Sequence, residues 1–473
     1  MRYLLLGWLC FWGIGTPIFA QTDAHYWTNQ YGAKGLLLNG AVIASTEDET
    51  AIFYNPGAMG TGEEFGLSLS FLTPTYSVLE TRNFLGNGTK VTDRDFGFTS
   101  GFAAVGFRLF NNERFRGGAT TFTRFKSNLN FRGREIGRVP DSDLLIFIGN
   151  LDFQRRLSER WVGFGMSYQM GANISLGVSQ FVVFHSESTN IEIAKEIVNR
   201  ASPEKLIFGW RSKLRYNFTA SGGMLTKFGL SWQPPKFKFG LTLTTPTYNH
   251  IVRSASFEFD DLRKPSPDST FIKSNLSGVS LKNYKTPWSL GFGLDFAINP
   301  NTRISFSTEY FHEIETYTIM EDTDDPFDGF SIGDFSEEVS IKTGNKQVCN
   351  VALGIQRELE NESTLILGFR TDFNQRKEVE GFSEFAFLAA TPSIYHFSAG
   401  GLFNVWKNQM SLGVDYGVGR RTGGQQLVDF SSITPDDLFS LTPAENAKSI
   451  YHSIVLVVTY DFIFKRKRKK KKK

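Results

Sequence analysis

Residues 288–298 read Trp-Ser-Leu-Gly-Phe-Gly-Leu-Asp-Phe-Ala-Ile, and large apolar side chains alternate there with small or charged ones. Side chains of a β-strand point alternately to its two sides, so this segment predicts a strand with one apolar face, beginning at Trp288. The other face begins at Ser289, is rich in Gly and includes Asp295. This division is typical of a membrane barrel, in which the apolar face contacts lipid and the polar face lines the lumen.

The same alternation recurs along most of the chain. It is clear over residues 410–418 and over 454–464, where the apolar face ends on Phe464. We count about 14 such segments between 65 and 464, an even number as expected for a bacterial single-chain barrel. The predicted fold class is therefore all-β: a transmembrane antiparallel up-and-down β-barrel of about 14 strands.

Short and long connections take turns between these segments, as in an outer-membrane barrel with short periplasmic turns and long external loops. The predicted tight turns are 111–114, 158–160, 234–236, 299–302, 360–362 and 407–408. The predicted long loops are 79–94, 132–142, 185–205, 260–285, 318–345, 375–393 and 420–449. Within the third loop, Thr189 and Glu192 form a capping-box pattern, which predicts a short helix there. Thr434–Asp437 shows a second helix start.

Composition agrees with this class. The chain has 473 residues, 46 of them Phe, and its mean hydropathy is only −0.21. A barrel keeps the average low because only alternate strand residues face lipid. The net charge is +3, and much positive charge lies in the terminal run 465–473, KRKRKKKKK. One terminal run without interleaved aromatics disfavours nucleic-acid binding. Such a tail can contact anionic lipid headgroups or cell-wall polymer.

The first twenty residues are typical of a secretory signal. Arg2 precedes an apolar stretch, and Ile18-Phe19-Ala20 is typical of a cleavage site. Removal of residues 1–20 would leave Cys349 as the only cysteine, so no internal disulfide is expected. Residues 21–63 are rich in Gly, Ala and Asn and predict either a plug within the lumen or a disordered periplasmic arm. The predicted organisation is a signal peptide (1–20), a hatch (21–63), a barrel (64–464) and a basic tail (465–473).

The plug segment resembles the N-terminal hatch of FadL-type outer-membrane transporters, which carry long-chain fatty acids and other hydrophobic compounds. The similarity lies in residues 35–44, GLLLNGAVIA, and in Asn55-Pro56-Gly57-Ala58-Met59. Residues 286–293, TPWSLGFG, also resemble a Pro-then-Gly strand of that family. The family usually has Ala after Asn-Pro, so Gly57 is a departure that predicts a looser turn.

This resemblance implies uptake through a plugged barrel with a lateral exit to the bilayer. Ligand would bind above the hatch and leave where a strand near the start of the barrel is kinked. Asn55, Pro56 and Gly57 would shape the hatch turn, and Gly117-Gly118 is the candidate kink or, equally, a bulge for curvature. The apolar hatch residues would line the pocket or only seal the plug: Leu36, Leu37, Leu38, Val42 and Ile43.

Alternation places several cations on the predicted lumenal face. Arg124, Lys126, Arg215, Lys227 and Arg370 are candidates to receive a carboxylate headgroup, and Arg can do so with two parallel hydrogen bonds. The alternative for each of them is a pair with a lumenal acid, such as the aspartate at position 415.

The partners implied are a hydrophobic small molecule such as a fatty acid, outer-membrane lipid and the barrel assembly machinery, with the chain as a monomer in a Gram-negative outer membrane. The alternative function is a diffusion channel, or porin, for small polar solutes, although a large plug disfavours free diffusion. An enzyme is disfavoured because no Ser-centred motif or metal-ligand spacing accompanies the six His. No cofactor or metal is expected.

Overall fold

The computed structural model describes part of the chain, and its first described residue is Ala24. It describes residues 24–463 except 47, 62–65, 71–72, 87, 100, 111, 113, 249, 271, 279–283, 322–339, 361, 379–390, 406–407, 425, 427, 431–437 and 439–445. The predicted signal peptide, the terminal Phe464, the basic tail and the helix start at 434–437 lie outside the described residues.

The elements are almost all strands, which confirms the all-β class. The short helical segments are α2 (Ala33–Leu37), α3 (Ala51–Tyr54) and the 3-10 helix η1 (Pro56–Gly60). The strands are β1 (Gly66–Ser70), β2 (Thr73–Arg82), β3 (Lys90–Thr99), β4 (Phe102–Arg108), β5 (Phe115–Arg138), β6 (Leu145–Gln169), β7 (Ile174–Asn199), β8 (Ser202–Trp232), β9 (Phe237–Thr244), β10 (Val252–Lys264), β11 (Ile272–Gly278), β12 (Ser289–Asn299), β13 (Thr302–Phe311), β14 (Ile314–Glu321), β15 (Ser340–Asn345), β16 (Val348–Glu358), β17 (Thr364–Asp372), β18 (Ile394–Val405), β19 (Asn408–Gly424) and β20 (Ala447–Ile463). Among the described residues, no helix is long and apolar enough to cross a membrane.

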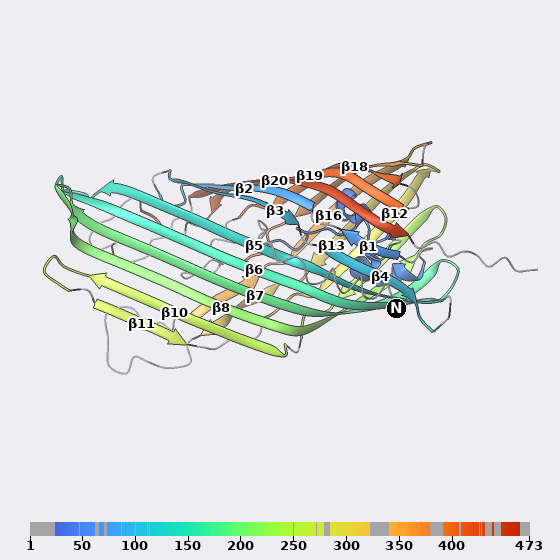
Figure 1. Ribbon diagram of the computed structural model, residues 1–473, viewed down its shortest axis with the longest axis horizontal. Coiled ribbons are helices and arrows are strands. Elements are labelled where there is room, and N and C mark those ends of the chain that lie inside the picture. Colours follow the sequence, from blue (N-terminus) through green and yellow to red (C-terminus); the bar gives the residue numbers. More distant parts are fainter. Residues whose placement is uncertain are drawn as a thin grey trace, which may run out of the picture.

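Antiparallel pairing closes the main sheet on itself (Figure 1). The ladder runs from β20 through β1, β4, β5, β6, β7, β8, β9, β12, β13, β16, β17, β18 and β19 back to β20. The hairpin of β10 and β11 extends from the outer part of β8, and β14 pairs with β15 separately. Closure removes the sheet edges that an open sheet would expose.

The outer face of the barrel carries large apolar side chains. On β12, Leu290, Leu294, Phe296 and Ile298 are exposed, as the alternation of residues 288–298 predicts. Gly291 and Gly293 face inward, where a Cβ would meet Ile43 of the N-terminal segment. The polar face of that strand therefore lies against chain inside the barrel.

The N-terminal segment, residues 24–61 as described, lies inside the barrel (Figure 1). Nearly all of its described residues are buried. Helix α2 packs on β17 to β20, and η1 packs on β5 to β8, on the other side. The segment contributes to one of two apolar clusters, in which Tyr31, Leu37 and Phe53 pack with wall residues such as Phe102 and Phe122.

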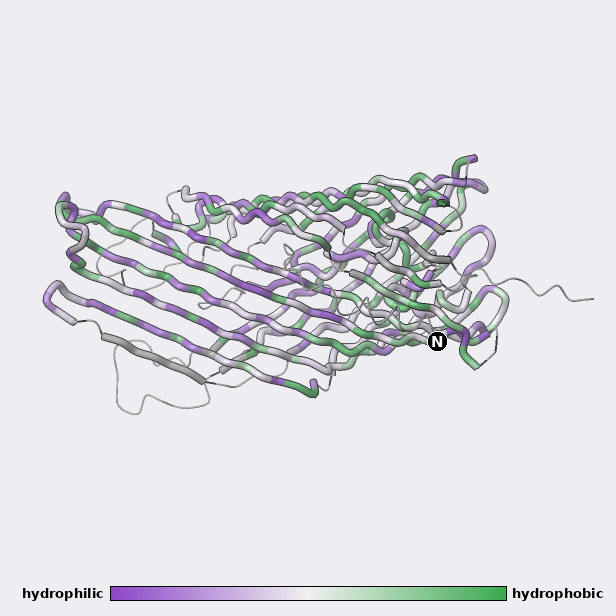
Figure 2. Tube along the Cα trace, in the orientation of Figure 1, coloured by the Kyte–Doolittle hydropathy of each residue, from purple (hydrophilic) through white to green (hydrophobic). Residues whose placement is uncertain are grey.

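Strands β5 to β8 extend far beyond the rest of the barrel (Figure 2). In the extended part the apolar side chains point inward, whereas in the apolar outer band they point outward. On β6, Phe164 and Val162 are exposed, whereas Phe153 and Phe147 farther along are fully buried. These inward residues join a second apolar cluster with loop residues such as Phe430. The extended part is thus built like a soluble sheet, apolar inside and polar outside.

The short helix predicted from the capping-box pattern of Thr189 and Glu192 is wrong. Strand β7 continues to Asn199, and Ile191, Ile193 and Ile197 all point into the second apolar cluster. The capping-box pattern does not produce a helix here, because pairing with β6 and β8 provides the backbone hydrogen bonds and buries alternate side chains. The predicted loops at 132–142 and 185–205 are therefore largely strand, although their outward side chains are polar.

Candidate ligand-binding site

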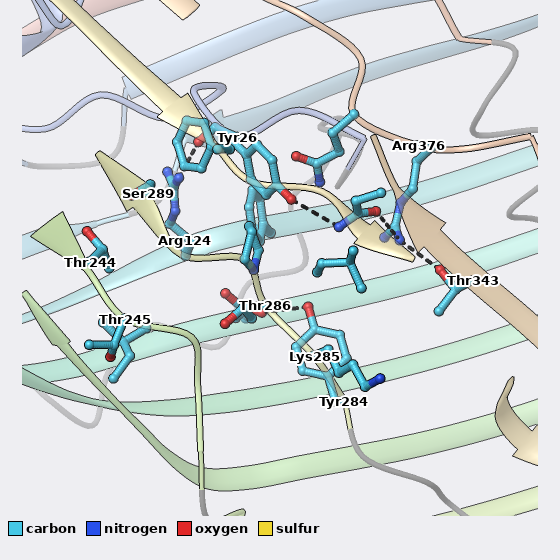
Figure 3. A pocket seen from close by; sticks show the side chains of 18 of the residues that line it. Tyr26, Arg124, Thr244, Thr245, Tyr284, Lys285, Thr286, Ser289, Thr343 and Arg376 are labelled. Carbon is cyan, nitrogen blue, oxygen red and sulfur yellow. Dashed lines mark hydrogen bonds between the residues drawn. The ribbon is translucent and has the colours of Figure 1, made fainter. Parts of the chain in front are cut away.

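A cavity lies between the N-terminal segment and the second apolar cluster (Figure 3). Its empty volume is about 960 Å³, counting the part that opens to solvent. The N-terminal segment contributes Tyr26 and Phe53, and the remaining lining comes from β5 to β9, from β12 to β15 and from the segments beside them. The cavity is therefore a chamber in the lumen, lined at one end by a segment that fills the barrel.

Aromatic rings form much of its lining. Tyr26 stacks on Phe311 with ring centroids 4.1 Å apart. Phe53 lies 6.4 Å from Trp161, centroid to centroid, with an angle of 63° between the ring planes. Phe125 belongs to the same lining. Such surfaces favour an apolar ligand, which gains roughly 0.8 kcal/mol for each CH₂ it buries.

Two buried cations lie beside these rings. Arg124 is only 6% exposed and Lys227 only 7%. The Arg124 guanidinium donates to the carbonyl of Tyr26 and lies 5.6 Å from the Phe53 ring centroid. Lys227 Nζ donates to the Phe53 carbonyl at 2.9 Å and lies 5.1 Å from the same ring. Within the described part of the chain, neither cation forms an ion pair with a carboxylate.

The acids of the cavity already have partners. Glu159 accepts a hydrogen bond from Trp161 Nε1 at 2.8 Å. Glu309 accepts one from Trp27 Nε1 at 2.8 Å and one from Ser289 Oγ at 2.7 Å. Arg124 bonds to the Tyr26 carbonyl and the Tyr31 hydroxyl, and Lys227 bonds to the Phe53 carbonyl, so the charge of both cations has no carboxylate partner among the described residues. An anionic group is the natural complement, because a buried cation is costly without one.

The outer wall of the cavity also carries aromatic residues. Tyr284 stacks on His185 with centroids 4.2 Å apart. Lys285 Nζ lies 4.5 Å from the ring centroid of Tyr317. Burial raises the pKa of Tyr317, so its phenol stays neutral at ordinary pH. These residues contribute apolar surface and cation–π contact at this end of the chamber.

The predicted hatch turn is held tightly against the wall. Asn55 Oδ1 accepts from the Gly57 amide at 3.0 Å, and Asn55 Nδ2 donates to the carbonyls of Ile43 (2.9 Å) and Leu230 (3.0 Å). Pro56 begins η1. A Cβ at Gly57 would lie 2.8 Å from the carbonyl of Gly229, so close approach to β8 requires glycine here.

The predicted apolar hatch residues pack on wall glycines and are absent from the cavity lining. Leu37 contacts the positions of Gly400 and Gly413, and Leu38 that of Gly354. Leu36 and Val42 belong to the first apolar cluster. Of the two uses considered from the sequence, sealing the lumen is the one their position supports.

Gly117 and Gly118 lie in an unbroken ladder. Gly118 pairs with Gly106 on one side and Gly165 on the other. A Cβ at Gly118 would meet Ile52 of the N-terminal segment. These glycines allow close packing, and the interruption of the wall lies elsewhere, between β3 and β5.

Contrary to the prediction, Lys126 and Arg215 do not face the lumen. A bulge at Thr123/Phe125 shifts the alternation of β5, so Lys126 faces outward although Arg124 faces inward. A second bulge, at Gly222 with φ of 76°, does the same on β8. Arg215 is exposed and pairs with Glu258 at 3.0 Å. An inserted residue reverses the side to which every later side chain points. Strict alternation along the sequence does not predict this reversal.

Arg370 faces the lumen but lies away from the cavity. Its guanidinium donates to the Thr28 carbonyl at 3.1 Å and to Asn39, both in the N-terminal segment. It also lies 3.6 Å from Asp415 and 3.0 Å from His396. Arg370 therefore links the N-terminal segment to the wall and pairs with a lumenal acid, as the alternative interpretation held.

Phe53, Trp161 and Tyr26 are cavity residues that the sequence analysis did not select. They come from separate elements, and no spacing along the chain connects them. Only Phe53 gave a sequence signal, because it lies in the hatch-like segment two residues before Asn55.

The closed sheet, the buried N-terminal segment and the cavity together define a β-barrel whose lumen holds part of its own chain. Its structure is similar to that of the Pseudomonas putida toluene transporter TodX, with a TM-score of 0.59 and 14% identity over 93% of this chain and 99% of that one. It is also similar to a Pseudomonas aeruginosa FadL homologue, with a TM-score of 0.58 and 11% identity over 93% and 100% of the chains. It is similar as well to the Ralstonia pickettii toluene transporter TbuX, with a TM-score of 0.55 and 14% identity over 92% of this chain and 99% of that one.

These neighbours are transport proteins, not enzymes. At these identities the likeness establishes the fold, which is that of FadL-type transporters. No protein-family model matches the sequence, and no curated protein matches it at a significant level.

Proposed function

We propose that this protein is an outer-membrane transporter that takes up long-chain fatty acids or similar amphipathic carboxylates. The observation that carries the proposal is the pair of buried cations, Arg124 and Lys227, beside Phe53 in an aromatic cavity. A carboxylate would pair with both cations, while an apolar chain would lie on the rings. The neighbours named as carriers of toluene and of monoaromatic hydrocarbons support a hydrophobic ligand in general.

In this proposal the N-terminal segment is the hatch. Its side chains bury against the wall on both sides of the lumen, so free diffusion of polar solutes is disfavoured. We extend the same proposal to the organisation of the chain: signal peptide 1–20, hatch 21–63, barrel of about 14 strands over 64–464, and basic tail 465–473.

We place the proposed lateral exit between β3 and β5. Strand β4 pairs with β5 along Phe102–Arg108, whereas β3, among the described residues, pairs only with β2. Beyond Thr123, β5 therefore has no ladder partner on that side among the described residues. Single hydrogen bonds, such as that from Thr89 Oγ1 to Glu135, join it to the hairpin of β2 and β3. Asp93, Asn128 and Asn130 line the gap that results.

Aromatic residues connect the cavity to this interruption. The Phe53 ring lies 5.0 Å from Phe122, and Phe122 lies 6.1 Å from Phe102, the first residue of β4. Outside the wall, Phe96 and Phe98 have centroids 5.9 Å apart, and Phe96 is 66% exposed. This path would let an apolar chain pass to the bilayer without crossing a wet pore.

The proposed location is the outer membrane of a Gram-negative bacterium, with the chain as a monomer inserted by the barrel assembly machinery. The exposed apolar band on β6, β8, β12 and β20 supports contact with lipid.

The test is binding of a radiolabelled long-chain fatty acid to the detergent-purified, folded protein. We expect saturable binding that weakens at least tenfold in the Arg124→Gln/Lys227→Gln variant. The matching fatty alcohol, which lacks the charge, should bind the variant and the unaltered protein alike. Arg215→Gln is the control, because that cation lies outside the barrel wall.

Absence of saturable binding by the folded protein, with steady ion conductance in planar bilayers, would favour the porin alternative. Equal binding of the acid by the double variant would remove the role given to the two cations.

A further inference from the structure

The outer face of β6 changes from apolar to polar between two consecutive outward residues, Val162 and Arg160. Val162 and Phe164 are 43% and 42% exposed, and the next outward residues along the strand are Arg160, Ser158 and Arg156. On β7 the same line falls between exposed Phe184 and exposed Ser186. Residues advance about 3.4 Å each along an antiparallel strand, so Arg160 lies just beyond the apolar band.

Three cations gather at this line on β5 and β6. Lys126 lies opposite Ser158 in the ladder, which makes Arg156 and Arg160 its two diagonal neighbours on the same face. Diagonal neighbours in an antiparallel pair are about 7–8 Å apart. Burial and the nearby Arg160 lower the pKa of Lys126, in agreement with this proximity. We call Lys126, Arg156 and Arg160 the basic rim.

The acids near the two arginines of the basic rim have another partner or face inward. Asp152, the acid of the adjoining part of β6, is 3.2 Å from Arg132. Neither Arg156 nor Arg160 forms an ion pair with any described residue. Asp93 and Asp95 share the inward side of β3 with buried Val91.

Farther out on β8, two of the three outward cations have acidic partners. Arg211 lies 3.6 Å from Glu192, and Arg215 lies 3.0 Å from Glu258. Arg156 and Arg160 differ from these two arginines in having no ion pair with a described acid.

We propose that the basic rim binds the phosphate groups of lipid A in the outer leaflet. Lipid A is a diphosphorylated glycolipid whose phosphates lie at the upper limit of the hydrocarbon layer, the level of Arg160. Arginine and lysine are the usual phosphate ligands, and arginine adds paired hydrogen bonds. This inference rests on the outer-membrane location proposed above.

The position of the basic rim has a consequence for transport. Lys126 is two residues from Asn128, which lines the gap between β3 and β5. A bound glycolipid would therefore stand beside the proposed exit and fix the orientation of the barrel wall there.

The experiment is a titration of the purified full chain with lipid A, followed by native mass spectrometry. The rim variant is Lys126→Gln/Arg156→Gln/Arg160→Gln, and the matched control is Arg211→Gln/Lys213→Gln/Arg215→Gln on β8. We expect the rim variant to bind lipid A at least tenfold more weakly and the control to stay within twofold of the unaltered protein. Monophosphorylated lipid A should bind the unaltered protein several-fold more weakly.

Equal binding by the rim variant, or an equal loss in both variants, would overturn the proposal. Displacement of lipid A by millimolar inorganic phosphate would also overturn it, by showing a simple phosphate site. Heat-dependent migration on gels verifies that each variant is folded. Fatty acid binding by the rim variant, measured in parallel, should be unchanged, which separates failure of this proposal from failure of the proposed function.

Discussion

Several single residues in this barrel are fixed by close approach between the wall and the N-terminal segment. A Cβ at Gly177 would collide with the carbonyl of Pro56, and one at Gly229 with Asn55. Both glycines allow backbone to lie against backbone, which a larger residue would prevent. The small inward residues of the sequence pattern therefore accommodate chain inside the lumen as well as lining it.

Asp93 is a residue whose charge should govern stability. It lies beyond the outward apolar Phe96, and burial together with nearby Asp95 raises the pKa of Asp93 to about 7. The folded state then holds this proton between about pH 4 and pH 7, whereas the unfolded chain releases it, so stability falls as pH rises through that window. Asp93→Asn should raise stability by roughly 1–2 kcal/mol at pH 8 and little at pH 4.

Thermal unfolding of Asp93→Asn and of the unaltered protein at pH 4, 6 and 8 measures this difference in stability. Glu258→Gln, an exposed carboxyl already paired with Arg215, is the control and should lack the pH-dependent gain. A constant difference between Asp93→Asn and the unaltered protein across this range would contradict the assignment.

Among elements, β3 and β4 form one wall strand in two parts. β4 pairs with β1 and with β5, whereas β3 pairs with β2. The ladder on the β5 side of this wall strand therefore ends where β4 gives way to β3. A bulge in β5 at Thr123/Phe125 lies at the same level. The two irregularities together leave the gap through which we propose that ligand leaves.

Bridging this gap should stop transport without stopping binding. In a Cys349→Ser background, we expect a bifunctional thiol reagent joining Thr92→Cys to Asn130→Cys to lower fatty acid uptake several-fold. Both positions line the gap. Uptake by cells before and after cleavage of the linker measures the effect, and reduction should restore it.

The control pair is Arg132→Cys/Asp152→Cys, which lies across the intact ladder between β5 and β6. Joining these two should leave uptake unchanged. Normal uptake through a bridged gap would exclude this route.

At the scale of the whole molecule, the barrel has two zones of opposite polarity. The lower zone is apolar outside and is filled by the N-terminal segment. The upper zone of β5 to β8 is polar outside and encloses its own apolar core, with Phe131 and Phe153 fully buried. The physical reason is the solvent, because hydrocarbon surrounds the first zone in the proposed setting and water the second.

The two zones should therefore have separable stabilities. Phe153→Ala removes a fully buried ring from the upper core and should cost about 3–5 kcal/mol. Hydrogen exchange should increase in the outer parts of β6 and β7, while their apolar-banded parts and heat-dependent gel migration stay unchanged. Ile136→Ala, at a residue 58% exposed, is the control. Equal loss of protection along the whole of β6 would show a single cooperative unit.

The sequence determined the fold class because the alternation of residues 288–298 and its repeats records which face meets which solvent. It also indicated a lumenal N-terminal segment and the Asn55–Gly57 turn, since those residues are local in the chain. Arg124 was recoverable for the same reason, because no bulge intervenes between it and the preceding part of β5. The positions of Lys126 and Arg215 were not, because one inserted residue in each strand reverses the later alternation.

Only the tertiary structure decided the cavity and the interruption of the wall. Phe53, Trp161 and Lys227 meet because barrel closure brings α3, β6 and β8 to one place, and no spacing encodes that meeting. It also decided that residues 189–199 form a strand, since the burial of Ile191 and Ile193 depends on partners on β6 and β8. Local patterns fix which way a side chain tends to point, and long-range pairing fixes what it then meets.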